Sequence, residues 1–201
     1  MIRHDTTVRC VLPLSLSVLA SASADAHGGT GLAGGFPMGF EHPLTGFDHL
    51  LAMVSVGVWG AVLGRPLLYS LPVVFPVVMV LGALLGMLAI PLPSVELGIA
   101  LSVLVLGACV GLSIRAPVWV AALIVGTFAV FHGYAHGTEL PSAADPIGYS
   151  VGFVLATGLL HVLGIFIGTL NDGRAGAAVM RGLGGVISAA GVWFLLRAVS
   201  A

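Results

Sequence analysis

Six long apolar stretches, separated by short breaks, follow one another along most of the chain. They cover roughly residues 44–63, 67–89, 95–113, 117–136, 147–169 and 178–199. Each stretch is close to the ~20 residues that an α-helix needs to cross the hydrocarbon core of a bilayer. The breaks contain Pro, Gly, Asn or Asp, which are typical of turns. The pattern predicts an all-α, polytopic membrane bundle with six transmembrane helices in one domain.

The composition agrees with this fold class and excludes several others. The 201 residues are 58% hydrophobic and 7% charged, whereas soluble domains have about a quarter of charged residues. With so few basic residues, the chain cannot form the surface that a nucleic-acid binder needs to neutralise phosphates. Its apolar runs are continuous, unlike the short alternating strands of an outer-membrane barrel. The expected surroundings are therefore membrane lipid.

The N-terminal residues 1–26 have the three parts of a secretory signal peptide. Arg3 and Arg9 supply positive charge, a short apolar core follows, and residues 24–26 read Ala-Asp-Ala, an A-x-A cleavage site. The apolar core is too short to span a bilayer. We expect cleavage after this site; the alternative is a signal anchor that is never cut.

Cleavage would leave residues 27–201 as the mature domain, with His27 at its N-terminus. A free α-amine beside an imidazole is a good chelate for a late first-row divalent metal, because both nitrogens can bind one ion. His27 is therefore a candidate metal ligand. The alternative is that it follows the cleavage site by chance.

The distribution of Arg predicts the orientation in the membrane. A cleaved signal peptide places the mature N-terminus in the periplasm, so the first, third and fifth loops face the cytoplasm. These loops contain four of the five mature Arg residues, namely Arg65, Arg115, Arg174 and Arg181. The two outward loops contain none, as the positive-inside rule requires. We expect a multi-pass protein of the bacterial inner membrane.

Polar residues gather at the outward start of the first expected span. His42 and His49 are seven residues apart, so they share a face if the helix is regular there. Met53 follows one turn later and could add a thioether ligand, although a Met in a membrane helix more often serves packing. Asp48 could ligate a metal, or it could accept an N–H from an imidazole and fix its tautomer.

A second polar group ends the fourth span, which runs outward, so this group also lies at the outward end of the bundle. His132 and His136 are four residues apart and lie on one face, and Glu139 follows three residues later. Ionisable residues inside membrane spans are costly, so they indicate function unless each is satisfied by a neighbouring carbonyl. Imidazoles with few carboxylates favour Ni, Zn, Cu or Co over Mg and Ca. We predict a transition-metal site at the outward end of the bundle.

Two further residues are candidates for a path through the bundle. His161 lies about fourteen residues into the fifth span, roughly 20 Å from its outward end. It could be a second station on a route to the cytoplasm or a single interhelical hydrogen bond. Glu96, at the outward start of the third span, could guard the entrance or be a solvated end residue.

The two polar groups lie in motifs that resemble those of the HupE/UreJ family of bacterial nickel permeases. The motifs read His42-Pro43-x-x-Gly46-x-Asp48-His49-x-x-Ala52-Met53-x-x-Val56-Gly57 and Phe131-His132-Gly133-x-Ala135-x-Gly137-x-Glu139. Both match without a gap, and the resemblance extends over the mature chain. It implies secondary transport of Ni²⁺, or of Co²⁺ in related members, for hydrogenase or urease maturation. The functional set that it implies is His42, Asp48, His49, His132 and Glu139, to which we add His136 and His161 by position.

We therefore expect a permease, not an enzyme, with the metal ion as cargo rather than as a prosthetic group. Cytoplasmic nickel chaperones are candidate partners. One alternative is an intramembrane zinc-dependent hydrolase with Glu139 or Asp48 as general base, although no H-E-x-x-H motif is present. The other is a metal sensor or assembly factor without transport.

Overall fold

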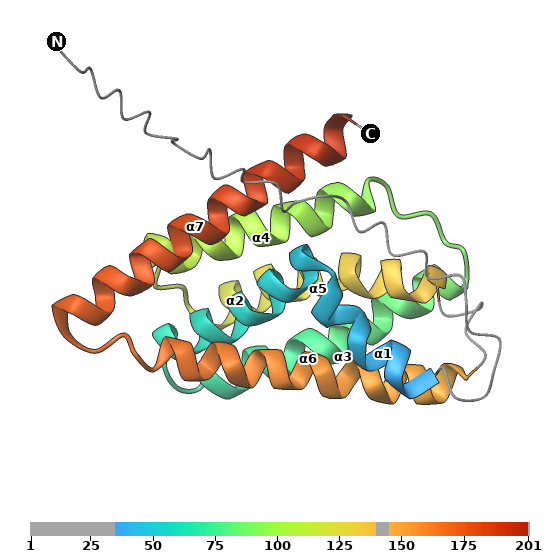
Figure 1. Cartoon of the computed structure of the whole chain (residues 1–201), viewed down its shortest axis with the longest axis horizontal. Coiled ribbons are helices and arrows are strands. Elements are labelled where there is room, and N and C mark those ends of the chain that lie inside the picture. The colour runs from blue at the N-terminus through green and yellow to red at the C-terminus, as the bar shows by residue number, and fades with distance from the viewer. Residues whose placement is uncertain (1–34, 140–144, 201) are drawn as a thin grey trace, which may run out of the picture.

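Seven α-helices make up the part of the chain that this computed structural model describes, residues 35–139 and 145–200 (Figure 1). They are α1 (Gly35–Thr45), α2 (Phe47–Leu63), α3 (Leu67–Met87), α4 (Val95–Gly111), α5 (Val118–Glu139), α6 (Pro146–Gly168) and α7 (Gly173–Ser200). No strand occurs among these residues, which confirms the all-α class. The expected signal peptide and His27 lie outside the described residues.

Four helices, α3, α5, α6 and α7, are long and apolar enough to cross a membrane. Helices α1 and α2 pass the same test only as a pair, and they are bent by 79° at the break between them. Helix α4 is apolar but has 17 residues. The structure thus supports four of the six expected spans directly, and the other two stay predictions.

The first expected span, residues 44–63, is where the structure departs most from the prediction. Gly46 has an extended backbone (φ −79°, ψ 103°) between α1 and α2, and α2 begins only after it. Pro43 lies near the end of α1. The regular helix that would have put His42 and His49 on one face is therefore broken by Gly46.

Several helix pairs pack with their backbones in close contact at Gly residues. In three of these pairs the contacts include Gly133 to Met79 and Gly137 to Ala83 (α5 to α3), Gly164 to Val54 and Gly168 to Val58 (α6 to α2), and Gly184 to Gly111 and Gly191 to Leu104 (α7 to α4). Each Gly lacks the side chain that would hold the neighbouring helix away. The order of these contacts makes α5 parallel to α3, α6 parallel to α2, and α7 antiparallel to α4.

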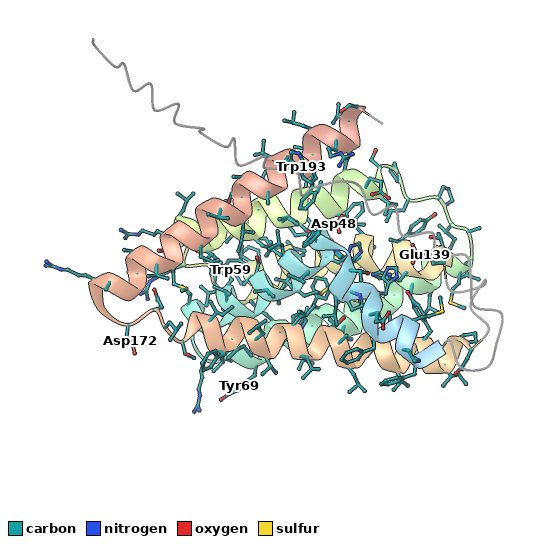
Figure 2. The ribbon with its side chains drawn as sticks, in the orientation of Figure 1. Asp48, Trp59, Tyr69, Glu139, Asp172 and Trp193 are labelled. Atoms are coloured by element: carbon teal, nitrogen blue, oxygen red, sulfur yellow. The ribbon has the colours of Figure 1, made fainter. Side chains whose placement is uncertain are left out.

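These directions gather the starts of α2 and α6 and the end of α5 at one end of the bundle. Figure 2 shows Asp48 and Glu139, from α2 and α5, in the same half of the molecule. The connection that contains Asp172 lies at the far extremity of the other half. The two polar motifs therefore meet in space although about ninety residues separate them in sequence.

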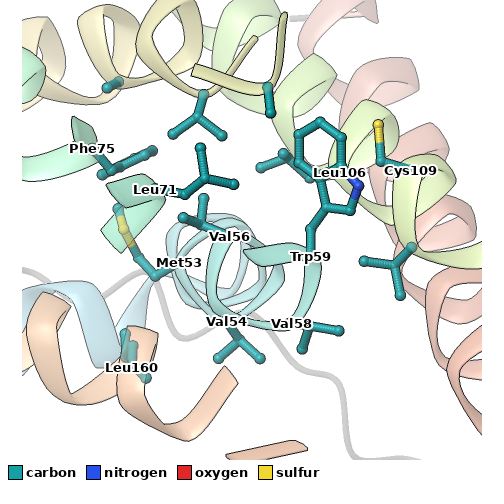
Figure 3. Packing of buried hydrophobic residues seen from close by; sticks show 14 of the residues in the cluster. Met53, Val54, Val56, Val58, Trp59, Leu71, Phe75, Leu106, Cys109 and Leu160 are labelled. Atoms are coloured by element: carbon teal, nitrogen blue, oxygen red, sulfur yellow. The ribbon is translucent and has the colours of Figure 1, made fainter. Parts of the chain in front are cut away.

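The hydrophobic core surrounds α2. In Figure 3, Leu71 and Phe75 of α3 lie on one side of α2, and Leu106 and Cys109 of α4 lie on the other. The Trp59 indole fills the space toward α4 and donates a hydrogen bond to the Ile114 carbonyl, at 3.1 Å. The outer faces of the long helices instead expose large apolar side chains, which fits a protein surrounded by lipid.

Candidate metal site

Four imidazoles from α1, α2 and α5 form a continuous row, here called the histidine cluster: His42, His136, His49 and His132. The ring centroids are 4.8 Å apart for His42 and His136 and 4.9 Å apart for His136 and His49. They are 4.8 Å apart for His49 and His132. Each ring thus touches the next, and the structure brings both sequence motifs into one site.

The histidine cluster leads from a partly open mouth into the protein interior. The side chains of His42 and Glu139 are 33% and 54% exposed, whereas that of His136 is 7% exposed. His132, at the other end of the row, has no exposed surface. An ion that moved along the row would therefore be progressively removed from solvent.

The bend at Gly46 puts His42 where it can meet α5. Helix α1 turns away from α2, and the His42 ring lies 6.2 Å from that of His49 but only 4.8 Å from that of His136. Gly46 also leaves room for the start of α2, because a Cβ there would lie 3.3 Å from both Asp48 Oδ1 and His49 Nδ1. The break at Gly46 therefore helps to form the histidine cluster in addition to redirecting the chain.

Asp48 orients His49. Its Oδ1 accepts a hydrogen bond from the His49 backbone N–H at 2.8 Å and lies 2.9 Å from the ring Nδ1. A carboxylate in that position accepts the Nδ1 proton and leaves the lone pair on Nε2. The buried Nε2 has no hydrogen-bond partner among the described residues. Of the two roles considered for Asp48, the geometry favours the orienting one.

His132 is held in the same way by a different acceptor. Its Nδ1 lies 2.9 Å from the Phe128 carbonyl, one turn earlier on α5. Its Nε2 is buried and, within the described part of the chain, has no partner. His49 and His132 therefore each present an unused Nε2, the arrangement that a metal-binding imidazole needs.

At the mouth, two imidazoles and a carboxylate form a second donor group. His42 Nε2 lies 3.4 Å from Glu139 Oε2, and His136 Nδ1 lies 3.8 Å from the same oxygen. Donor atoms of these three residues all lie within 4.8 Å of one another. Two ligands about 2.1 Å from one metal can be no more than about 4.2 Å apart. Only small side-chain rotations are needed to close the group on an ion.

Aromatic side chains that the sequence reasoning missed form the wall of the site. The Phe153 ring packs against that of His136 in a tilted arrangement, with ring centroids 4.2 Å apart, and the Tyr149 ring lies 6.0 Å from that of His42. Both come from α6, one turn apart. Phe75 of α3 lies 5.5 Å from His132. An i, i+4 aromatic pair at the start of a span was the available signal for the α6 residues.

An apolar pocket lies beside the histidine cluster, between α3, α5 and α6. His136, Tyr149 and Phe153 line its inner side, and the half-exposed Val80 and Val154 line its outer side. Its surface is almost entirely apolar. A hydrated ion would lose solvation there without replacement. The polar approach to the cluster is therefore the mouth at His42 and Glu139.

The structure places the remaining candidates outside the cluster. Met53 is fully buried in the hydrophobic core, where it contributes packing. Glu96 is exposed in the first turn of α4 and is absent from the mouth donor group. His161 is buried on α6.

Comparisons with known proteins cover most of the bundle. The family model described as "HupE / UreJ protein" matches residues 14–194. Protein HupE of Rhizobium leguminosarum bv. viciae is 45% identical over 183 residues, which cover 90% of this chain and 95% of that protein. No solved structure matches. The matched region contains every member of the histidine cluster.

Proposed function

This chain belongs to the HupE/UreJ family, and on that premise we propose that it is a permease that carries Ni²⁺ from the periplasm to the cytoplasm. The observation that supports this most strongly is the row of imidazoles from a partly exposed His42 to a fully buried His132. A static binding site needs one pocket of donors. A row of touching donors that runs inward is suited to an ion that moves.

The donor set suits a borderline divalent metal. Four imidazoles and the Glu139 carboxylate supply nitrogen and oxygen, which favour Ni²⁺, Co²⁺, Cu²⁺ or Zn²⁺ over Mg²⁺ and Ca²⁺. The family resemblance of the two motifs selects Ni²⁺, or Co²⁺, among these. Conduction needs sites that bind strongly enough to replace water yet weakly enough to release the ion. Neutral imidazoles meet this requirement better than a cage of thiolates.

The carboxylates have separate tasks in this proposal. Glu139, more than half exposed between His42 and His136, attracts the hydrated cation and provides the first oxygen ligand. Asp48 stays on the protein side, where it holds His49 with Nε2 toward the cluster. Its negative charge also partly neutralises the ion while water is lost.

The membrane potential supplies a driving force. With the Arg-rich loops in the cytoplasm, the mouth of the cluster faces the periplasm. An inside-negative potential then favours inward movement by about 2.3 kcal/mol per charge for each 100 mV, so twice that for a divalent ion. Released Ni²⁺ would be available to cytoplasmic chaperones for metalloenzyme maturation.

Uptake of radiolabelled Ni²⁺ into sealed proteoliposomes, with and without an inside-negative potential, tests this function. We expect saturable uptake that the potential accelerates and that His49→Ala abolishes. Ser188→Ala, on the α7 face that packs against α4, is the matched control and should transport normally. Competition by Co²⁺ and Zn²⁺ ranks the metals. Thermal unfolding of each variant establishes that it is folded.

The same experiment separates the alternatives. Ni²⁺ binding in detergent without saturable uptake would reject the permease and favour a metal sensor or assembly factor. Metal-dependent cleavage of peptide or lipid in detergent would favour the hydrolase, because a hydrolase needs no sealed membrane.

A further inference from the structure

One buried imidazole lies beyond the histidine cluster. His161 of α6 is 1% exposed, and neither ring nitrogen has a hydrogen-bond partner in the described part of the chain. Buried polar groups in proteins normally have such partners, so an unpartnered one needs an explanation. An ionisable residue inside a membrane span is also a functional candidate by default.

Phe75 connects His161 to the histidine cluster. Its ring centroid lies 5.5 Å from that of His132 and 5.5 Å from that of His161, and Phe75 itself has no exposed surface. His161 is therefore one aromatic ring beyond the innermost imidazole of the cluster. The row of imidazoles continues past Phe75 rather than ending at His132.

The backbone of α3 provides an oxygen beside His161. In an α-helix the carbonyl of residue 72 would accept the N–H of residue 76, but Pro76 has no N–H. The carbonyl of Pro72 is left without that partner and interacts with the His161 ring, although no hydrogen bond of normal geometry joins them. It is thus available as an oxygen donor.

A hydroxyl lies one helical turn before His161 on the same side of α6. Thr157 has no exposed surface, and its Oγ1 has no hydrogen-bond partner within the described residues. A Thr in a membrane helix commonly bonds a carbonyl one turn earlier, which Thr157 does not do here. An imidazole nitrogen, a carbonyl oxygen without its usual helical partner and a hydroxyl oxygen therefore occupy one region of the bundle.

From this juxtaposition we propose a second, inner metal-binding station, with His161 as nitrogen ligand and the Pro72 carbonyl and Thr157 hydroxyl as oxygen donors. Its ligand is a borderline divalent cation in transit, so the inference rests on the proposed permease function. One imidazole binds such an ion more weakly than several. Sites of decreasing strength allow the ion to leave toward the far side, as conduction requires.

Two variants of the full-length protein test the inner station in proteoliposomes with Ni²⁺ as the only added metal. His161→Ala removes the ligand, and His161→Gln keeps an N–H donor for the Pro72 carbonyl while removing the imidazole. We expect both to lower the initial rate of potential-driven uptake by about tenfold or more. Tight Ni²⁺ binding in detergent should be unchanged in both, because the histidine cluster is intact. Thr157→Val should lower the rate by a smaller factor.

Normal uptake by His161→Gln would overturn the inference, because it would show that a buried hydrogen bond is all that His161 supplies. Loss of tight binding in folded His161→Ala would also overturn it, because His161 would then belong to the cluster. Failure of the wild-type protein to transport would instead reject the permease itself. Normal wild-type uptake together with normal uptake by both His161 variants would reject only the inner station.

If His161→Ala does not fold, a second measurement still tests the inner station. Equilibrium Ni²⁺ titration of the wild-type protein in detergent should resolve a tight equivalent and a weaker one. His49→Ala should lose the tightly bound Ni²⁺ and keep the weakly bound Ni²⁺. His161→Gln should keep the tightly bound Ni²⁺ and lose the weakly bound Ni²⁺. A single equivalent in the wild-type protein would contradict an inner station.

Discussion

Two helix pairs of this bundle pack through glycine contacts of the same kind, but only one of the pairs contains residues of the histidine cluster. Helices α4 and α7 meet where Gly184 contacts Gly111, and α3 and α5 meet where Gly133 contacts Met79. Both contacts depend on the absence of a side chain. Helices α4 and α7 contain no His, whereas in α5 a His directly precedes each packing Gly.

The glycine contacts of α5 with α3 explain how the imidazoles of α5 are oriented. Gly133 and Gly137 lie against α3, and His132 and His136 are one residue earlier, so they point about 100° around the helix. That direction faces the rings of His49 and His42. A tight glycine contact on one face therefore fixes the metal ligands on the next. In the α4–α7 pair the same contact provides only a scaffold.

The largest expected difference between the two regions appears when a buried polar group is removed from each. His132→Ala should abolish saturable Ni²⁺ uptake, because it removes an unused Nε2 from the row. Ser102→Ala removes a fully buried hydroxyl from α4, where it donates a hydrogen bond to the Ile99 carbonyl, at 2.6 Å. Its uptake should stay within about a factor of two of the wild type, since such intrahelical bonds contribute little. Equal losses of Ni²⁺ uptake in the two variants would contradict the difference between the α3–α5 and α4–α7 pairs.

A smaller loss is expected from Asp48→Asn, which keeps the shape of the side chain and removes its charge. The amide no longer holds the His49 proton on Nδ1 as a carboxylate does, so Nε2 is less available. Ni²⁺ affinity should fall by about 10–100-fold, as for other groups that orient a metal-binding imidazole. Isothermal titration in detergent measures it. An unchanged affinity would mean that Asp48 does not set the orientation of His49.

Substitutions of the packing glycines test the same difference between the two helix pairs. A Cβ at Gly133 would lie 1.9 Å from the Met79 carbonyl oxygen, and one at Gly184 would lie 2.1 Å from the Gly111 nitrogen. Gly133→Ala and Gly184→Ala should therefore each lower the free energy of unfolding by a similar amount, about 1–3 kcal/mol. Only Gly133→Ala should also weaken Ni²⁺ binding, because it shifts the neighbouring imidazole. Equal weakening in both would show that α4 and α7 take part in the site.

The smallest effect is expected where a glycine has open space. Among the described residues, no atom outside the local helix backbone would lie within 4 Å of a Cβ at Gly182 or Gly158. Gly182→Ala in α7 and Gly158→Ala in α6 should leave both Ni²⁺ affinity and thermal stability close to wild type. Measuring them beside the two packing variants separates steric effects from the general effect of replacing Gly. A large loss in either would contradict the assigned helix contacts.

Much of this arrangement was accessible from the sequence. Hydrophobic run length predicted the helical class, and the positions of the two motifs predicted that four imidazoles would gather at one end. The bend at Gly46 was not predicted, because a single Gly in an apolar helix is usually tolerated and only tertiary packing decides otherwise. The bend changes how His42 reaches the site, from one face of a helix to a contact across helices with His136.

The residues around the imidazoles were harder to foresee. Phe75 and Phe153 look like ordinary apolar residues of a span, because single aromatic side chains are common there. Their contacts with His132 and His136 follow from the parallel packing of α5 on α3 and the closeness of α6. The role of the Pro72 carbonyl follows from Pro76 once α3 is known to be continuous through both prolines.

X-ray absorption spectroscopy at the nickel edge tests the central claim most directly, namely that the histidine cluster binds the transported ion. The full-length protein would be loaded with one equivalent of Ni²⁺ in detergent. We predict nitrogen and oxygen ligands, outer-shell scattering from at least two imidazoles, and no sulfur, since Met53 lies in the core. His49→Ala should lose part of the imidazole signal. A spectrum of oxygen ligands without imidazole scattering would contradict the account.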